Sequence, residues 1–146
     1  MEFRTSSHEA TYNRIKPMMK ELFGETGAQP REDVPQWIVQ AGSAIVLVGV
    51  MPWRDDASLV SALSWVTRGT DLTPECLKYL LEQNHEFVFG GFSVDQEGDI
   101  AFSHTILGDT CDKEELKSLV MAVAVTADSQ DDTIVSRWGG TRAADR

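Results

Sequence analysis

Histidine and cysteine side chains are the first candidates for chemistry at neutral pH, because they can exchange protons or act as nucleophiles there. The chain has three histidines and two cysteines. His8 lies in an N-terminal segment that we expect to be mobile, His85 follows an expected helix, and His104 alternates with apolar residues as in a buried strand. Cys76 and Cys111 have the spacing of neither a metal site nor a disulfide framework. We expect no catalytic or metal site among these five side chains.

Two acidic turns are the remaining candidates for a bound ion. Asp95, Glu97 and Asp99 bring three carboxylates into one turn, but the turn joins two expected strands and does not match a calcium loop between helices. The run Gly108-Asp109-Thr110 precedes an expected helix, whose N-terminus attracts anions, yet the carboxylates around it would repel a phosphate. No Gly-x-Ser-x-Gly motif or glycine-rich dinucleotide fingerprint is present. We predict a protein that is not an enzyme and has no cofactor.

The balance of charge limits the partners. Thirteen basic side chains stand against 23 acidic ones, a net charge of -10. Residues 71–146 hold most of the excess, with 15 acidic and 6 basic side chains. We therefore expect the protein to bind neither nucleic acid nor anionic membrane surfaces, because both attract basic patches.

No stretch of the sequence predicts a membrane span. The longest apolar run, Ala44–Trp53, has ten residues, about half of what a membrane-spanning helix needs. Charged residues interrupt the first fifteen positions, which argues against a secretory signal. Because the two cysteines also look like reduced thiols, we expect a cytoplasmic protein.

The elements that would position a site begin with an amphipathic helix over residues 8–23, which Gly24 ends. Pro17 falls in the middle, so the helix either kinks there or begins near it. Residues 24–35 are rich in glycine, proline and charge and predict a loop. We therefore divide the chain into an N-terminal helix and loop (1–35), a body belonging to the same single domain (36–140) and a frayed tail (141–146).

Three strands are expected at the start of the body. Residues 37–39 and 44–53 are β-branched and aromatic runs separated by a four-residue turn, which predicts an antiparallel hairpin. Residues 59–67 fit a strand or a helix by periodicity alone. The flanking turns and the ending Trp65-Val66-Thr67 favour a third strand.

The second half predicts a helix, a hairpin and a long helix. Thr73-Pro74 has the chemistry of a helix start, and that helix runs to about residue 84. Residues 87–94 and 100–107 predict two strands joined by a tight turn. A capping box from Asp112 to Glu115 begins the last helix, and Gly139-Gly140 ends it.

This order, α-β-β-β-α-β-β-α, indicates an α+β fold. Strands joined by hairpins with helices set apart from them predict a five-stranded antiparallel sheet with helices packed on it. In that arrangement we expect Phe102 and Leu119 to be core positions, because they lie on the apolar sides of a strand and of the last helix.

Several motifs resemble the YbjN-like family of bacterial proteins over about residues 36–140. The most specific are a Leu-Gly-Asp-Thr turn (107–110) and an Ala-x-x-Ala-Asp helix segment (124–128). Further matching runs are Leu72-Thr73-Pro74-Glu75, Tyr79-Leu80-Leu81, Phe89-Gly90-Gly91-Phe92-Ser93, Gly98-Asp99-Ile100 and the closing residues Trp138-Gly139-Gly140. These are structural signatures and carry no catalytic residues.

The resemblance implies a fold similar to that of type III secretion chaperones. Such proteins are small, acidic, cytoplasmic and usually dimeric, and their sheet and helices bind an extended segment of a partner. The family has also been described as a regulator in sensory transduction. Residues 1–35 depart from the family pattern, and Pro17 lies within them.

Two functions of different class follow from these observations. The first is a non-enzymatic chaperone-like or adaptor protein that binds segments of a partner through apolar contacts and edge-strand pairing. The alternative is a regulatory module that binds a small molecule. We also expect a homodimer, because a short helix carries more apolar surface than one sheet face needs, and the resemblance points the same way. The candidate dimer face consists of Leu77, Tyr79, Leu80 and Leu81.

Overall fold

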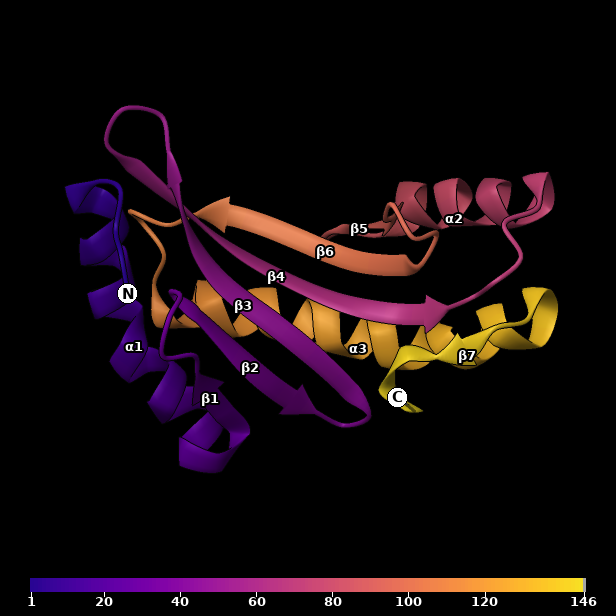
Figure 1. The fold of residues 1–146 in the computed structure, drawn as a ribbon, viewed down its shortest axis with the longest axis horizontal. Helices are drawn as coiled ribbons and strands as arrows, with labels where there is room; N and C mark the ends of the chain where they lie inside the picture. The colour runs from indigo at the N-terminus through magenta and orange to yellow at the C-terminus, as the bar shows by residue number, and fades with distance from the viewer. Residues whose placement is uncertain (146) are drawn as a thin grey trace.

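A seven-stranded antiparallel sheet forms the centre of the computed structural model, which describes residues 1–145. Neighbouring strands follow the order β1-β2-β3-β4-β6-β5, and β7 pairs with β4 outside this path (Figure 1). The strands are β1 (Ala28–Pro30), β2 (Gln36–Ala41), β3 (Ala44–Trp53), β4 (Ala57–Arg68), β5 (Gly91–Val94), β6 (Ile100–Leu107) and β7 (Thr141–Arg142). The helices are α1 (Ser6–Gly27), α2 (Pro74–Glu86), α3 (Lys113–Trp138) and the short 3-10 helix η1 (Ala143–Asp145).

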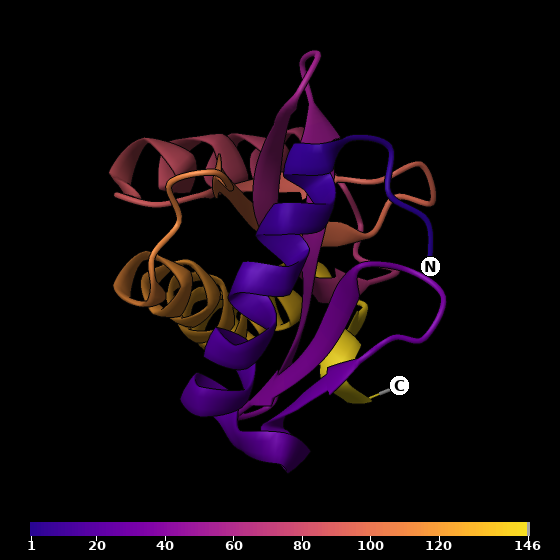
Figure 2. The same cartoon turned by 90° about the vertical axis from the view of Figure 1, so that its left-hand side faces the viewer.

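One face of the sheet is covered by helices, and the other is open. Along β3, Val46, Val48 and Val50 are buried on the covered face, whereas Ile45 and Met51 are exposed on the open one. Helix α3 runs lengthwise along the strands, and α1 crosses them at one end (Figure 1). Seen from the α1 end, α2 and α3 lie together on one side of the strands (Figure 2).

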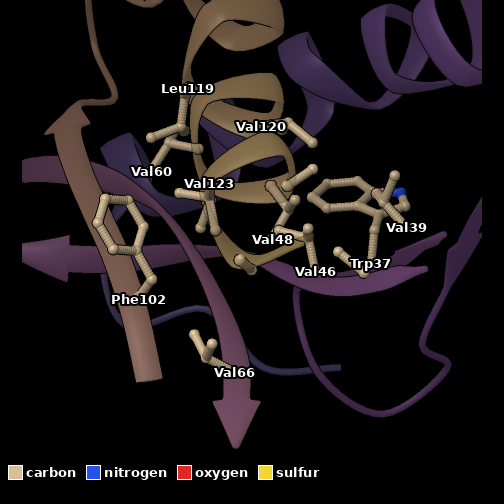
Figure 3. Close-up of a cluster of buried hydrophobic side chains, with 14 of the residues drawn as sticks. Trp37, Val39, Val46, Val48, Val60, Val66, Phe102, Leu119, Val120 and Val123 are labelled. Carbon is tan, nitrogen blue, oxygen red and sulfur yellow. The ribbon is translucent and has the colours of Figure 1, made fainter. Parts of the chain in front are cut away.

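The core lies between the covered face and the two longer helices. Figure 3 shows Phe102 of β6 and Leu119 of α3 directed toward Val60 of the central strand β4. Phe102 is fully buried and Leu119 nearly so, which confirms both predicted core positions. At the other end of the core, Trp37 of β2 stacks on Tyr12 of α1 with 4.9 Å between the ring centroids.

Residues 59–67, which fitted a strand or a helix by periodicity, belong to the strand β4. This strand pairs with β3 on one side and β6 on the other, so the favoured prediction of a strand is confirmed. The local helix signals are confirmed as well. Thr73 caps α2 by accepting a hydrogen bond from the Cys76 amide, and Asp112 and Glu115 form the capping box of α3. The α+β architecture is therefore as predicted.

The prediction of a five-stranded sheet is wrong, because the sheet has seven strands. β1 has three residues and ends in a proline, and β7 has two, so neither is long enough to show an alternating pattern. Residues 141–142 pair with β4 and residues 143–145 form η1, where a frayed tail was expected; residue 146 lies outside the described residues. The strand predicted over residues 87–94 shortens to β5, because Gly90 has a φ of 75° and the Phe87 ring turns into the core against Phe102.

Helix α1 extends beyond its predicted range at both ends and continues through Pro17. Pro17 is exposed, so the carbonyl group that loses its helix bond there can be hydrated. The interruption falls instead at Gly24, whose φ of 74° and ψ of 175° are not helical. The last turn of α1 therefore changes direction and leads into β1.

Candidate functional site

The three histidines serve the structure in separate places. His8 is buried, contrary to the expected mobile terminus, and its Nε2 lies 3.0 Å from the carbonyl oxygen of Val50. His104 is half-buried with its ring centroid 5.6 Å from that of Phe89, and His85 is exposed in the last turn of α2. No two of these histidines are brought together.

Both cysteines are buried free thiols. Burial is the main cause that raises the pKa of Cys76, and it raises the pKa of Cys111 to about 11. Both groups are therefore protonated at neutral pH and poor nucleophiles. Within residues 1–145, no cluster of three or more His, Cys, Asp and Glu side chains is placed to hold a metal ion. None of the helices in the same range is long and apolar enough to cross a membrane.

The acidic turn between β5 and β6 is part of the hydrogen-bonding framework. Asp95 accepts a hydrogen bond from the indole Nε1 of Trp65 at 2.9 Å, and Asp99 pairs with Arg68 at 3.0 Å. The hydrogen bond from Trp65 is the main cause that lowers the pKa of Asp95. These two carboxylates fix the turn against β4.

The turn after β6 attaches the first half of α1 to the sheet. Asp109 accepts hydrogen bonds from the Ser7 hydroxyl and from the Ser58 amide, the latter at 2.9 Å. The Ser7 bond is the main cause that lowers the pKa of Asp109. Arg14 donates to the carbonyl oxygen of Gly108. This half of α1 is thereby held by polar contacts, while its second half meets β1 through apolar ones.

An open apolar groove of about 460 Å³ lies between the second half of α1 and β1. Its floor is made by Met19, Ala28 and Trp37, all of them buried. The Tyr12 ring stacks on the Trp37 ring of this floor. Figure 2 shows α1 descending in front of the strands to the turn that leads into β1. The remaining lining residues are Lys16, Pro17, Lys20, Gly24, Glu25 and Pro30.

The rim of the groove is positive, although the chain as a whole is acidic. Lys16 and Lys20 lie one helical turn apart on α1. Lys20 pairs with Glu25 at 2.8 Å, and both side chains are exposed. Two ammonium groups against one carboxylate leave the mouth of the groove with one net positive charge.

The outer edge of β1 can accept hydrogen bonds but has no free donor. Arg31 donates its amide to Gln36 of the neighbouring strand, so by alternation Ala28 and Pro30 direct their main-chain groups away from β2. The Ala28 amide is already bonded to the carbonyl oxygen of Gly24, and proline has no amide hydrogen. Only two carbonyl oxygens are left for a docking chain.

The opposite edge of the sheet, β5, is closed by a side chain. The Asn84 carboxamide of α2 accepts a hydrogen bond from the Phe92 amide at 2.7 Å and donates one to the Phe92 carbonyl oxygen at 3.3 Å. Asn84 thus takes the place of a neighbouring strand at the middle of β5. Such a block protects an edge strand against pairing with other chains.

The four residues of the predicted dimer face lie on two sides of α2. Leu77 and Leu81 are 40% and 69% exposed, whereas Leu80 is buried. Tyr79 donates a hydrogen bond from its hydroxyl to Gln130 of α3 at 2.8 Å and is engaged inside the molecule. Leu77 and Leu81 are therefore the two that remain available to a partner.

Residues 1–145 thus show an open apolar groove on an α+β body. The family model described as "T3SS (YopN, CesT) and YbjN peptide-binding chaperone 1" matches residues 9–146, and the chain belongs to this family. The resemblance found in the sequence is thereby confirmed, and the family match also covers most of the N-terminal segment that departs from the pattern.

A solved structure shares the fold. A chain of the HopA1-SchA chaperone-effector complex superposes with a TM-score of 0.63, covering 84% of this chain and 97% of that chain at 11% sequence identity. No curated protein matches this sequence.

Proposed function

We propose that this protein holds an extended apolar segment of a partner polypeptide in the groove between α1 and β1 and catalyses no reaction. The observation that carries the proposal is the groove's buried floor of Met19, Ala28 and Trp37 beneath an open mouth. Apolar concave surface of this kind favours a ligand with apolar side chains. Membership of a family described as peptide-binding chaperones supports a polypeptide as that ligand.

Side chains supply most of the affinity in this mode of binding. A segment beside β1 can donate to the carbonyl oxygens of Ala28 and Pro30 but receives no main-chain donor in return. Full strand addition, which draws on a ladder of reciprocal hydrogen bonds, is therefore replaced by insertion of side chains into the groove. Binding should accordingly have a negative change in heat capacity, because apolar surface is buried.

A charged residue at the groove should abolish binding and leave the fold intact. Pro30 is an exposed apolar position in β1 whose ring has no amide hydrogen to lose, so Pro30→Glu places a carboxylate in the groove without breaking a hydrogen bond. Val94→Glu is the matched control, since Val94 is exposed on β5 at the opposite edge of the sheet. We expect the parent and Val94→Glu proteins to capture the same polypeptide from native lysate, and Pro30→Glu to lose at least nine-tenths of it.

Mass spectrometry of the captured material separates the hypotheses. A synthetic peptide from the captured chain should bind the parent in calorimetry and lose at least tenfold in affinity toward Pro30→Glu. Equal capture by all three proteins would contradict the groove as the site. Stoichiometric co-purification of a small molecule without any polypeptide would favour the regulatory alternative, which requires an enclosed pocket with converging polar groups.

We also propose that the protein is a cytoplasmic homodimer joined through α2. The two buried free cysteines support a reducing compartment. Leu77 and Leu81 lie one turn apart on α2, and the exposed Val88 and Phe89 follow in the next loop, so that this helix and its following loop carry four exposed apolar side chains.

Light scattering after size-exclusion chromatography tests the dimer. At micromolar concentration the parent should have twice the 16.2 kDa mass of the chain, and Leu81→Asp should have the mass of one chain. Leu107→Asp is the control, because Leu107 is 51% exposed on the open face of the sheet and away from α2. A parent mass near 16.2 kDa at every concentration would reject the dimer.

A further inference from the structure

The sheet divides at one end, between β3 and β4. The pairing of these strands ends at Leu47 opposite Leu63, and before that point β3 pairs only with β2. Residues 64–68 of β4 therefore have no β3 partner on that side, although β6 continues along the other side as far as Thr67. The result is a fork in the sheet whose β4 side is an edge for further pairing.

The chain's own C-terminal segment, residues 141–145, occupies this fork. β7 places Arg142 opposite Thr67 and Thr141 opposite Arg68. In Figure 1 the yellow segment leaves the end of α3 and runs along the arrowhead of β4 toward the turn between β2 and β3. On the open face, Ala143 and Ala144 border a cavity of about 190 Å³ together with Ile45, Leu47, Trp65 and Arg68, whose guanidinium is paired with Asp99.

The helix behind the fork presents acidic groups to the arginine of this segment. Arg142 donates two hydrogen bonds to Asp145 of the same segment, both at 2.9 Å, and also pairs with Asp132 of α3 at 3.7 Å. The neighbouring Asp131 is only 4% exposed. Burial is the main cause that raises the pKa of Asp131, and the nearby Arg142 charge opposes that shift. The carboxylate of Asp131 accepts its hydrogen bond from the adjacent Asp132 amide. The fork thus combines two carboxylates of α3, a strand edge and a small hollow lined mostly by apolar side chains.

The segment is held lightly. β7 comprises two residues, and the side chain of Asp132 is 80% exposed, so its ion pair with Arg142 contributes little. By contrast, the turn that precedes the segment is fixed, since Thr70 donates to the Gly139 carbonyl oxygen at 3.0 Å and both Gly139 and Gly140 have positive φ. Residues 141–145 can therefore leave the fork while α3 stays in place.

We propose that the fork is a second peptide-binding site, covered in cis by residues 141–145, and that its external ligand is an extended segment with an arginine followed by two small apolar residues. The arginine would lie against Asp132, the small residues would fill the hollow by Trp65, and the main chain would pair with β4. The cis segment acts as a tethered competitor at an effective concentration on the order of millimolar. A ligand must displace it to bind.

The test uses full-length proteins and a fluorescein-labelled peptide with the sequence of residues 139–145. Arg142→Glu removes the two hydrogen bonds to Asp145 and brings a third carboxylate beside Asp131 and Asp132. The repulsion between these like charges should release the segment, which hydrogen exchange would show as at least tenfold faster exchange over residues 141–145. The labelled peptide should then bind this variant at least tenfold more tightly than it binds the parent. Arg31→Glu is the matched control, because Arg31 pairs with Asp33 far from the fork in the strand order, and it should behave as the parent.

A second variant should release the segment through a different residue. Ala144→Glu places a charge at the apolar hollow and should release the segment in the same way. The proposal is overturned if residues 141–145 stay as protected as in the parent, or if they open and the peptide binds no more tightly. Unfolding of both variants would also overturn it, since a displaceable cover must come away from a folded body. Pro30→Glu should leave this binding unchanged, so failure here is distinct from failure of the groove.

Discussion

Replacement of Phe102 by alanine is expected to lower the free energy of unfolding by roughly 3 to 5 kcal/mol. The side chain is fully buried and meets Phe87 and Phe92 edge-on, with ring centroids 5.1 and 5.4 Å away. Phe87 lies in the segment between α2 and β5, and Phe92 lies in β5 itself, so the cavity would open where this part of the chain joins the sheet. Little of it can collapse, because β6 is held between β4 and β5.

Leu119→Ala should cost roughly 2 to 5 kcal/mol for the same reason, since Leu119 packs on the sheet from α3. Leu107→Ala, at a half-exposed leucine on the same strand as Phe102, should cost less than about 1 kcal/mol. Urea unfolding of the three variants gives all three values. Unfolding of both core variants within about 0.5 kcal/mol of the parent would show that the core is assigned wrongly.

Local signals in the sequence were sufficient for the helices and the long strands. Thr73, Asp112 and Gly139 act through their own backbone neighbours, so cap chemistry located the ends of α2 and α3 to within two residues. The alternation in the sequence of β6 reflects one covered and one open face. β3 was recognised instead as an unbroken apolar and β-branched run, and only its burial alternates between the two faces.

The groove could not be predicted in the same way, because β1 is defined by its partner. Residues 28–30 have no alternation, and Pro30 argues against a strand unless it lies on an edge, which is where the structure places it. Met19 lies within the amphipathic helix predicted over residues 8–23, yet an apolar helix face does not show which part of it the sheet leaves uncovered.

The strand β7 was not predicted either, which is why residues 141–145 were expected to be a frayed tail. β7 depends on the fork left by the divergence of β3 from β4, a feature of tertiary structure with no signature in residues 141–145. Conversely, Asn84 looked like an ordinary helix end, and its role in closing β5 depends on Phe92 eight residues later. Edge protection of this kind is invisible until the edge itself is known.

Substitution of Gly108 by alanine is the second large effect that we expect, at roughly 2 to 3 kcal/mol of lost stability. A Cβ atom at this position would overlap the Ser58 hydroxyl and lie 3.0 Å from Cγ2 of Thr11. Ser58 is fully buried, and its hydroxyl shares a 2.6 Å hydrogen bond with Thr11 of α1. A backbone shift gives no relief, because the Gly108 amide donates to the Ser58 carbonyl oxygen at 2.8 Å.

A double-mutant cycle identifies the cause of this loss. If the added methyl group acts by displacing the Ser58 hydroxyl, Gly108→Ala should cost about 1 kcal/mol less in a Ser58→Ala background than in the parent. Gly27→Ala is the matched control, because Gly27 lies in α1 with only an ordinary 3.4 Å contact at its Cβ position, and alanine favours the helix. An equal cost in both backgrounds would mean that the glycine is required for another reason than its contact with Ser58. The predicted result would explain the Leu-Gly-Asp-Thr turn physically, since its glycine lets the turn approach α1 and its aspartate then binds Ser7 and Ser58.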